Sequence, residues 1–393
     1  MTGHGFELTD EQTRLREIAA AVGREIKEDA VIWDREDLAP FKEVCARARE
    51  AGLLGLTMPV EYGGKGRTAL DYVIAVESVL RASQSWIGPE PLFCTSGPGV
   101  SMILLGDEPV RKKYLPELVT GELGAAIALT EPEHGSDLTL LETTAVRDGD
   151  HFVVNGHKSF ITGSGVNELY ATFVRMDGIP GPRGIAALVV EAELPGVTSV
   201  KGPEFIGDRG IPHGEIEFAD VRVPAENLIM GPGHFPRLMS AFNMERLHNC
   251  ALSLAIAEAA YDEAVSFVSN RVSFGRPIIE FQSVYHDLAD MWTKIEAQRL
   301  LAYRAGATAS EGRFPDAHDV TVAKLHGATI MGEVTMKSLE LHGGYGVTTD
   351  YPIQRIHRDA ISSIVAGGAP AVLRNSLAQM IFPNRKFPQT RGV

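Results

Sequence analysis

The hydrophobic spacing of this 393-residue chain changes twice along the sequence. Up to about Gly121, apolar residues recur every three or four positions. Between Gly124 and Gly233 they gather in short β-rich runs separated by turns, and from Phe235 onward the helical spacing returns. A helical period predicts helices, and short β-branched runs predict strands. Since one hydrophobic core rarely organises so long a chain, we expect an α+β protein with three domains. Their predicted bounds are 1–123 for an N-terminal helical domain, 124–234 for a middle β-barrel domain, and 235–393 for a C-terminal helical bundle.

Local signals place the individual elements. Thr9-Asp10-Glu11-Gln12 has the form of a capping box and predicts the start of the first helix. Asn155-Gly156 predicts a turn after a strand. Further helices are expected at 41–51, 69–83, 100–105, 110–119, 281–306, 316–342 and 371–380. Strands are expected at 151–156, 169–174, 185–190, 197–200 and 215–218.

Charge and composition argue against several classes of protein. The formal net charge is −14 and no basic stripe is present, which disfavours a nucleic-acid surface. No apolar run reaches the ~18–20 residues that a membrane span needs. The first five residues, 1–5, lack a basic region followed by an apolar one, so we expect a cytoplasmic protein. Cys45, Cys94 and Cys250 lie far apart without metal-ligand spacing, so we expect free thiols and no metal.

The segment 128–165 is the candidate cofactor site. It opens with Ala-Leu-Thr-Glu-Pro-Glu-His-Gly-Ser-Asp at 128–137. It closes with Asn-Gly-His-Lys-Ser-Phe-Ile-Thr-Gly-Ser-Gly at 155–165. Hydroxyls, backbone amides and one aromatic ring recur within it. That composition suits a flat ligand that forms hydrogen bonds.

Several separated motifs together resemble the acyl-CoA dehydrogenase family. The two segments above are similar to A-L-T-E-P-x-x-G-S-D and N-G-x-K-x-x-I-T. The stretch 217–227 looks like the family's signature at the end of the β domain, and Arg271 to Gln282 resembles R-x-x-F-G-x-P-I-x-x-F-Q. Gly343-Gly344-x-Gly346 and Arg358-Asp359 complete the order. Members are flavoproteins of fatty acid metabolism, with an N-terminal helical domain, a middle β domain and a C-terminal four-helix bundle.

The resemblance implies FAD as the cofactor, in two groups of contacts. Near the flavin ring it implies Leu129, Thr130, Ser136, Phe160 and Thr162, with Thr162 near flavin N5. A second group would grip the diphosphate and adenine of FAD bound mainly to another subunit: Arg271, Phe274, Gln282 and the backbone at Gly344. The forked donors of an arginine suit a diphosphate. The resemblance therefore implies a homo-oligomer, typically a homotetramer built as a dimer of dimers, and a hetero-oligomer is also possible.

The family reaction needs a carboxylate to remove the α-proton of the acyl thioester. In many members this base is the glutamate of a Y-E-G-T loop, but here Gly367 and Ala369 replace the glutamate and the threonine. Other members, including isovaleryl-CoA and long-chain dehydrogenases, carry the base on the first C-terminal helix, where this chain has Glu245-Arg246. On a buried helical face, desolvation would raise the pKa of Glu245 toward the value of a useful base. Alternatively, Glu245 is an ion-pair partner, and Arg246 either contacts the CoA arm or holds Glu245.

The substrate implied is an acyl-CoA in contact with Ser136, Phe242, Arg246 and Gly367. The glycine at 367 leaves room, which favours a branched, ring-containing or bulky acyl group. An electron-transferring flavoprotein would accept the electrons.

Two departures from the family pattern bear on the cofactor. Glu340 replaces a common glutamine near the diphosphate, where a carboxylate would repel phosphate unless it is paired. His134 replaces a small residue. Two alternatives stay open: a flavin oxidase or monooxygenase of the same fold, and a non-catalytic subunit of a hetero-oligomer, which the missing loop glutamate and Glu340 motivate.

Overall fold

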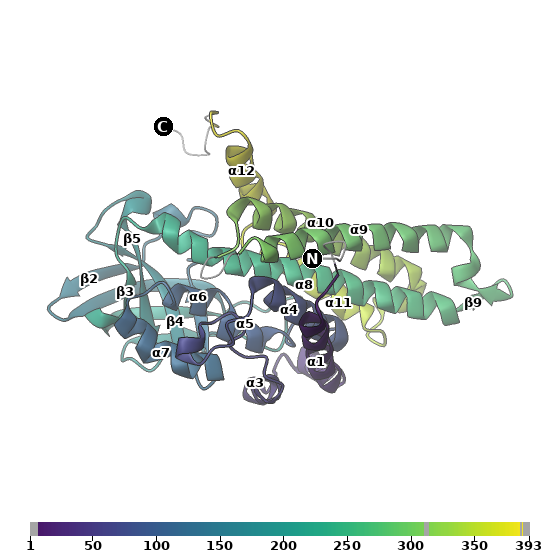
Figure 1. Cartoon of the computed structure of the whole chain (residues 1–393), viewed down its shortest axis with the longest axis horizontal. Coiled ribbons are helices and arrows are strands. Elements are labelled where there is room, and N and C mark those ends of the chain that lie inside the picture. Colours follow the sequence, from purple (N-terminus) through teal and green to yellow (C-terminus); the bar gives the residue numbers. More distant parts are fainter. Residues whose placement is uncertain (1–6, 310–313, 386, 388–393) are drawn as a thin grey trace.

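The computed structural model describes residues 7–309, 314–385 and 387. Residues 1–5, which entered the expectation of a cytoplasmic protein, lie outside this part of the chain. Within it, no helix is both long and apolar enough to cross a bilayer. The molecule is elongated, with the β-sheet at one end and a long helical bundle running to the other (Figure 1).

Short helices fill the N-terminal third. The first begins as predicted, because the Thr9 hydroxyl accepts the amide of Gln12 while the Gln12 side chain accepts the amide of Thr9. The helix predicted at 100–105 is present two residues earlier. Two further helices in this third, α2 and α5, were not predicted. The helices are α1 Asp10–Ile26, α2 Asp29–Glu36, α3 Phe41–Glu50, α4 Ala69–Ser83, α5 Glu90–Ser96, α6 Pro98–Ile103 and α7 Glu108–Thr120.

The middle third forms an eight-stranded mixed sheet with the order β6-β7-β3-β2-β4-β5-β8, in which β1 pairs in parallel with β4. Side chains on β4 and β5 alternate between two cores. One core lies under α6 and α7, and the other lies against β3 and β7. The strands are β1 Ala125–Ala128, β2 Thr144–Asp148, β3 His151–Thr162, β4 Leu169–Met176, β5 Ile185–Glu191, β6 Val197–Val200, β7 His213–Pro224 and β8 Leu228–Met230.

The turn predicted at Asn155-Gly156 is wrong. Strand β3 runs through both residues, and the pairing with β7 only shifts register there, as in a β-bulge. Gly156 has φ +153°, and a Cβ at this position would lie 2.5 Å from the Thr143 hydroxyl oxygen. The glycine therefore allows a close backbone approach within a strand and does not reverse the chain.

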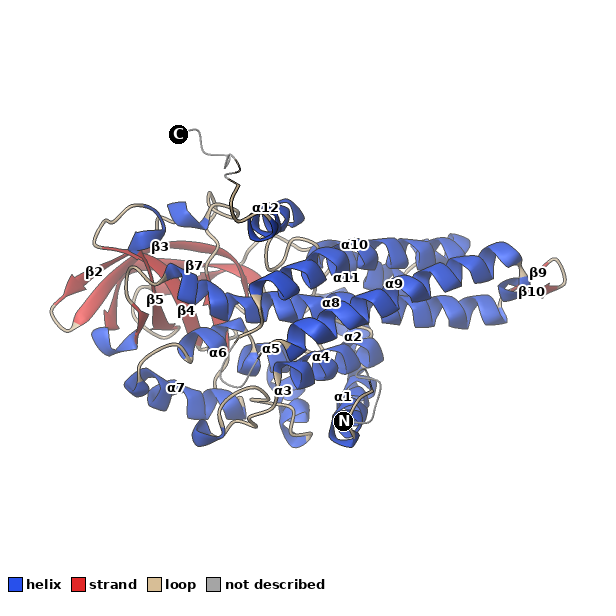
Figure 2. Ribbon diagram, turned by 45° about the horizontal axis from the view of Figure 1, so that its top comes forward, coloured by secondary structure: helices blue, strands red, loops and turns tan. Residues whose placement is uncertain are grey.

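The C-terminal third is a bundle of long helices that carries the candidate base. Helix α8 crosses the whole bundle, and the small hairpin β9–β10 lies at the end far from the sheet (Figure 2). Helix α11 was not predicted. The elements are α8 Phe235–Asn270, β9 Val272–Ser273, β10 Arg276–Pro277, α9 Gln282–Ala307, α10 Ala317–Leu341, α11 Ile353–Ser363 and α12 Pro370–Ile381.

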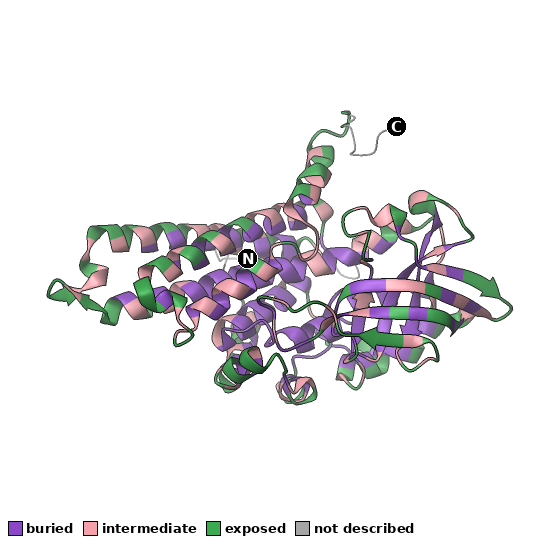
Figure 3. Ribbon diagram, turned by 180° about the vertical axis from the view of Figure 1, so that it is seen from behind, coloured by how far each residue is buried: buried purple, intermediate pink, exposed green. Residues whose placement is uncertain are grey.

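The largest hydrophobic core joins the two ends of the sequence. Apolar residues of α1 and α4 pack with those of α8, α9 and α10 in one cluster. Figure 3 shows the buried residues continuing from the N-terminal helices into the bundle. The middle of α8 is consequently enclosed by helices from both ends of the chain.

Candidate active site

The loop 129–137 and strand β3 lie side by side. The Lys158 Nζ of β3 donates to the Leu129 carbonyl oxygen at 3.2 Å and pairs with Glu131 Oε1 at 2.8 Å. The Ser159 amide donates to the Thr130 carbonyl oxygen at 2.9 Å. These contacts hold the two predicted motif segments together on one side of the candidate cofactor site.

The ion pair that joins the two segments is buried. The side chain of Lys158 is fully buried, and that of Glu131 is 4% exposed. Burial lowers the pKa of Lys158 to about 8, and the charge of Glu131 opposes that shift. Burial also acts to raise the pKa of Glu131, but Lys158 and hydrogen bonds from Thr143 and Glu142 hold it below its ordinary value. Both groups therefore stay charged as a pair near neutral pH.

The outer face of β3 presents Phe160 and Thr162. Phe160 has a left-handed backbone with φ +58°, and 54% of its surface is exposed, which is unusual for a large aromatic residue. Its ring lies 6.2 Å from that of Phe205, which stacks at 4.5 Å on His213, the residue paired with Thr162. A pocket of about 350 Å³ is lined by Phe205 and His213, among others. Ser136 is exposed on the loop 129–137.

The second group of predicted cofactor residues lies at the opposite end of the molecule. Arg271 ends α8, Phe274 lies in the β9–β10 turn, Gln282 begins α9, and Gly344 lies in the short helix η6, Gly343–Val347. The Arg271 guanidinium lies 5.6 Å from the centre of the Tyr345 ring. Phe274 is 93% exposed with φ +50°. Figures 1 and 2 place this hairpin far from the sheet, so the two groups do not meet within one chain.

Glu245 lies on α8 in the enclosed part of the bundle. Asn249, one turn later, donates to Glu245 Oε1 at 3.0 Å, while the buried Oε2 has no partner among the described residues. Burial raises the pKa of Glu245 to about 7, although Asn249, Lys324 and Arg246 act to lower it. A carboxylate with one fixed oxygen and one unpaired oxygen is arranged to accept a proton near neutral pH.

The loop that carries Gly367 lies directly on Glu245. Lys324 Nζ donates to the Ile364 carbonyl oxygen at 2.6 Å, and Arg246 Nε donates to the Gly367 carbonyl oxygen at 3.4 Å. A Cβ on Gly367 would lie 3.4 Å from Glu245 Cγ and 3.0 Å from Asn249 Nδ2. The two positions at which the family carries its base, 245 on α8 and 367 in the loop, are thus in contact with each other. The glycine at 367 leaves room for the Glu245 side chain.

Arg246 holds the loop. It donates to Asn243 Oδ1 at 3.1 Å, and its guanidinium lies 5.5 Å from the centre of the Phe242 ring. No hydrogen bond between Arg246 and Glu245 occurs in the described ranges. The structure therefore gives no direct support for the alternative in which Arg246 holds Glu245.

Comparison with known proteins identifies the family. Sequence models of the acyl-CoA dehydrogenase N-terminal, middle and C-terminal domains match residues 9–122, 126–221 and 235–382. A short-chain-specific acyl-CoA dehydrogenase of Clostridium acetobutylicum is 35% identical over 382 residues, 96% of this chain and 99% of the relative. The chain belongs to the acyl-CoA dehydrogenase family.

Two further similarities show how the family varies. Butyryl-CoA dehydrogenase from Megasphaera elsdenii has a structure that matches with a TM-score of 0.91 at 31% identity, covering 96% of this chain and 99% of that one. A 3-sulfinopropanoyl-CoA desulfinase of Paraburkholderia xenovorans is also 35% identical, over 99% of this chain and all of the relative. Acyl-CoA dehydrogenases are FAD-dependent oxidoreductases that act on CH–CH bonds, and the second relative shows that identity alone does not fix the acyl group.

The residues present fit FAD. The exposed ring of Phe160 and the nearby hydroxyl residues Thr130 and Thr162 offer a stacking surface and hydrogen-bond groups. At the far end, the guanidinium of Arg271 and the exposed Phe274 ring suit a diphosphate and an adenine. A Cβ on Gly344 would meet no atom within 4 Å, so the backbone there is open to a ligand.

Of the two departures from the acyl-CoA dehydrogenase pattern, the structure accounts for the one at Glu340. Glu340 Oε2 pairs with Lys337 Nζ at 2.6 Å, so the charge that would repel phosphate is partly balanced. His134 Nε2 lies 3.6 Å from Glu142 Oε1 on the side of the loop near Glu131. The pairing of Glu340 weakens one argument for a non-catalytic subunit.

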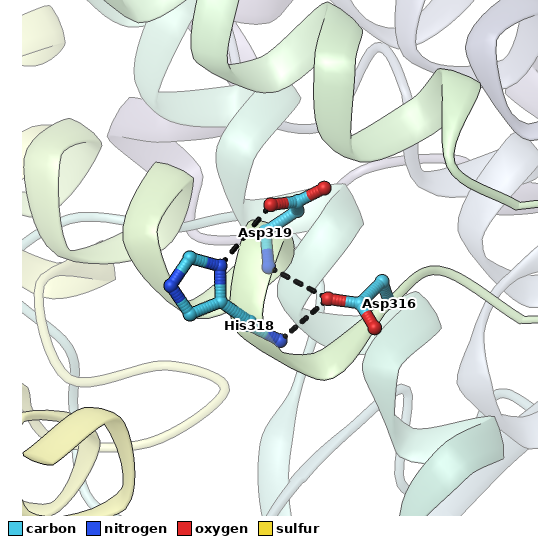
Figure 4. A group of neighbouring side chains, drawn as sticks. All are labelled: Asp316, His318 and Asp319. Atoms are coloured by element: carbon cyan, nitrogen blue, oxygen red, sulfur yellow. Dashed lines mark hydrogen bonds and ion pairs between the residues drawn. The ribbon is translucent and has the colours of Figure 1, made fainter. Parts of the chain in front are cut away.

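Asp316, His318 and Asp319 bring possible metal ligands together at the start of α10 (Figure 4). Asp316 Oδ1 accepts the amides of His318 and Asp319, so it caps the helix. Asp319 Oδ1 also pairs with Arg304 at 2.9 Å. Capping and ion pairing account for this group.

Sequence reasoning missed some polar residues around Glu245. Lys324 was not singled out, although it anchors the loop of Gly367 and its charge acts on Glu245. Tyr72 and Glu90, both buried, come from helices of the N-terminal third. His248 was predicted only to share the face of Glu245. No local signal distinguishes these residues from ordinary core or surface positions.

Proposed function

We propose that Glu245 is the general base with which this enzyme desaturates an acyl-CoA between the α- and β-carbons. The observation that carries this proposal is the buried, unpaired Oε2 of Glu245 on α8 beside a loop that lacks a glutamate at 367. A half-buried acid with one buried carboxyl oxygen and a perturbed pKa is a candidate for proton transfer.

The surrounding residues prepare Glu245 for this role. Asn249 fixes Oε1, which leaves Oε2 to receive the α-proton. Lys324 and Arg246 hold the loop on α8 and moderate the effect of burial on the pKa of Glu245. When bound, FAD supplies the acceptor for the β-hydride.

The cofactor contacts are proposed as two groups from different subunits. Leu129, Thr130, Ser136, Phe160 and Thr162 would hold the flavin. Arg271, Phe274, Gln282 and Gly344 of a second copy would hold the diphosphate and adenine. The distance between the two groups along the molecule supports this arrangement (Figure 1). A homo-oligomer follows, with a dimer of dimers as the proposed form and domain bounds of 1–123, 124–234 and 235–393.

The acyl group is proposed to be branched, ring-containing or bulky. Gly367 has no side chain, so the loop places no atoms of its own between Glu245 and the acyl group, although Glu245 takes part of the freed room. Phe242, Arg246, Ser136 and Gly367 would contact the acyl-CoA. A screen in which short straight-chain acyl-CoAs reduce the flavin fastest would contradict this part of the proposal.

Anaerobic mixing of the purified yellow protein with a panel of acyl-CoAs tests the base. We expect the flavin absorbance to bleach with at least one substrate, and Glu245→Gln to slow the bleaching by about 10²–10⁴-fold. Glu333→Gln, on the exposed face of α10, is the matched control and should bleach at the rate of the wild type. Equal bleaching by Glu245→Gln and the wild type would show that another residue takes the proton.

The electron acceptor is proposed to be an electron-transferring flavoprotein. Turnover that depends on a protein or artificial acceptor would support a dehydrogenase. Rapid reoxidation by air during turnover would support the oxidase or monooxygenase alternative instead, and a colourless protein would support a non-catalytic subunit.

A further inference from the structure

A second polar group lies on the same face of α8 as Glu245, one turn further along. His248 is 2% exposed, and its ring lies 4.6 Å from that of Phe93 in α5 and 5.9 Å from that of Tyr72 in α4. Residues three apart on a helix are surface neighbours, with Cβ atoms about 5–6 Å apart. His248 is therefore close to the place where the α-carbon of the substrate would lie.

The imidazole of His248 has one unused nitrogen. The Tyr72 hydroxyl lies 2.9 Å from Nδ1, whereas the buried Nε2 has no partner in the part of the chain that the structure describes. Burial lowers the pKa of His248 to about 3, so the ring is neutral. Because the Tyr72 hydroxyl has no other acceptor there, it donates to Nδ1, and the ring proton stays on Nε2. Nε2 is thus a donor without an acceptor, which is costly in a protein interior.

Glu90 adds another polar group to this region. It is the first residue of α5 and is 4% exposed, and its carboxyl group makes no hydrogen bond within the described ranges. Burial raises the pKa of Glu90 well above its ordinary value, with a contribution from Glu245. The region next to Glu245 thus holds His248 Nε2 and the Glu90 carboxyl group, which an entirely apolar acyl chain would leave without a hydrogen-bond partner.

We infer that His248 Nε2, supported by Tyr72, donates a hydrogen bond to an oxygen atom carried by the acyl group of the substrate beyond its β-carbon. The inference rests on the proposed desaturation and narrows its substrate class to acyl-CoAs with a hydroxyl or oxo group on the chain or ring. A site built to hydrogen-bond an oxygen rejects the analogue that lacks it, because the buried donor is then left unpaired.

The test compares matched pairs of acyl-CoAs in the flavin-containing protein. Hexanoyl-CoA and heptanoyl-CoA are each paired with their hydroxy and oxo positional isomers, and kcat/KM is measured for every member. We expect the wild type to prefer at least one oxygenated isomer by about tenfold or more. In His248→Leu this ratio should fall to near one, and Tyr72→Phe should lower it. His248→Gln, which keeps a side-chain donor, should retain part of it.

Binding provides a readout that does not depend on turnover. The S-alkyl-CoA thioethers of the same pairs, titrated by calorimetry, should show the same preference in the wild type and its loss in His248→Leu. Thermal unfolding of each variant separates loss of the contact from loss of the fold, and Tyr72→Phe removes only one hydroxyl.

The outcomes separate this inference from the proposed function. Reduction of the wild-type flavin by both members of every pair at similar rates would overturn the inference alone, since Nε2 would then contact only water. An unchanged ratio in both His248→Leu and Tyr72→Phe would also overturn it. A wild-type flavin that no acyl-CoA reduces, in a panel that also contains branched and ring-containing acyl groups, would contradict the desaturation itself, and the inference with it.

Discussion

At the scale of single residues, the charge state of Glu245 determines how the rate of flavin reduction depends on pH. Because burial raises the pKa of this carboxyl group to about 7, the base is mostly protonated in mild acid. We expect the rate of flavin reduction to rise with pH and to be about tenfold below its plateau one pH unit under that pKa. Stopped-flow measurement of bleaching across this range checks the prediction, and a rate independent of pH would contradict it.

The raised pKa of Glu245 also affects the stability of the fold, which falls as pH rises while the rate of flavin reduction increases. The folded pKa of Glu245 lies above its unfolded value, so the unfolded state loses this proton first as pH rises, and stability falls between about pH 4.5 and 7. Glu245→Gln removes this cost. We expect it to raise the free energy of unfolding by ~1–3 kcal/mol at pH 8 but much less at pH 5. Urea titrations at the two pH values measure the difference, and an equal effect at both would rule out the linkage.

Gly367 is constrained by both its backbone and its neighbours. Its φ is +67°, and a Cβ would lie 3.0 Å from Asn249 Nδ2, the group that fixes Glu245. Gly178 has a similar φ of +63° with nothing within 4 Å of its Cβ position, which makes it a matched control. We expect each glycine-to-alanine change to cost ~1 kcal/mol of stability, but only Gly367→Ala to slow flavin reduction. Equal kinetics for both variants would show that the contact is unimportant.

At the scale of elements, the buried pair Lys158–Glu131 joins the loop 129–137 to strand β3. Lys158→Met leaves the buried carboxylate of Glu131 without its partner, and we expect a loss of ~3–5 kcal/mol and weaker retention of flavin. The exposed pair Arg222–Asp148, at 2.6 Å in the same sheet, provides the control. Arg222→Met should cost less than about 1 kcal/mol. Chemical unfolding and the ratio of flavin to protein after gel filtration distinguish the two pairs.

The elements also show what the sequence could and could not predict. The Thr9 capping box and the helical spacing of apolar residues in α10 depend only on residues close together in the sequence, so they were predictable. Asn155-Gly156 looked like a turn because its chemistry suits one, whereas the actual constraint is Thr143, which reaches Gly156 only through strand pairing. Glu245 was found as a candidate, but Lys324 and the contact of Gly367 with Asn249 were not. They are long-range contacts that leave no local pattern.

At the scale of the whole molecule, a charged network ties the N-terminal helices to the bundle. Arg299 of α9 pairs with Glu77 of α4 and with Glu258 of α8, and Arg81 of α4 pairs with Glu258 at 2.8 Å. We expect Arg299→Met to lower the free energy of unfolding by ~3–5 kcal/mol, because two buried carboxylates lose a partner. Arg304, also on α9, pairs with Asp319 of α10 through a guanidinium that is 65% exposed, so Arg304→Met should cost little. Calorimetry that shows equal effects would contradict a stabilising role for the network.

Because the two groups of cofactor residues lie far apart on one chain, we expect two inactive variants, mixed in one oligomer, to restore activity. Glu245→Gln should bind flavin without reacting, and Arg271→Ala should react poorly because its copies cannot hold the cofactor of their neighbours. In a mixed dimer with two-fold symmetry, one site combines Glu245 from one chain with Arg271 from the other, and both are intact. Random association of equal amounts should therefore restore about one site in four. Co-expression with two affinity tags isolates the mixed dimers, and anaerobic bleaching of this doubly tagged fraction should show one working site in two. If each chain held its own FAD, every site would keep one defect and no activity would return.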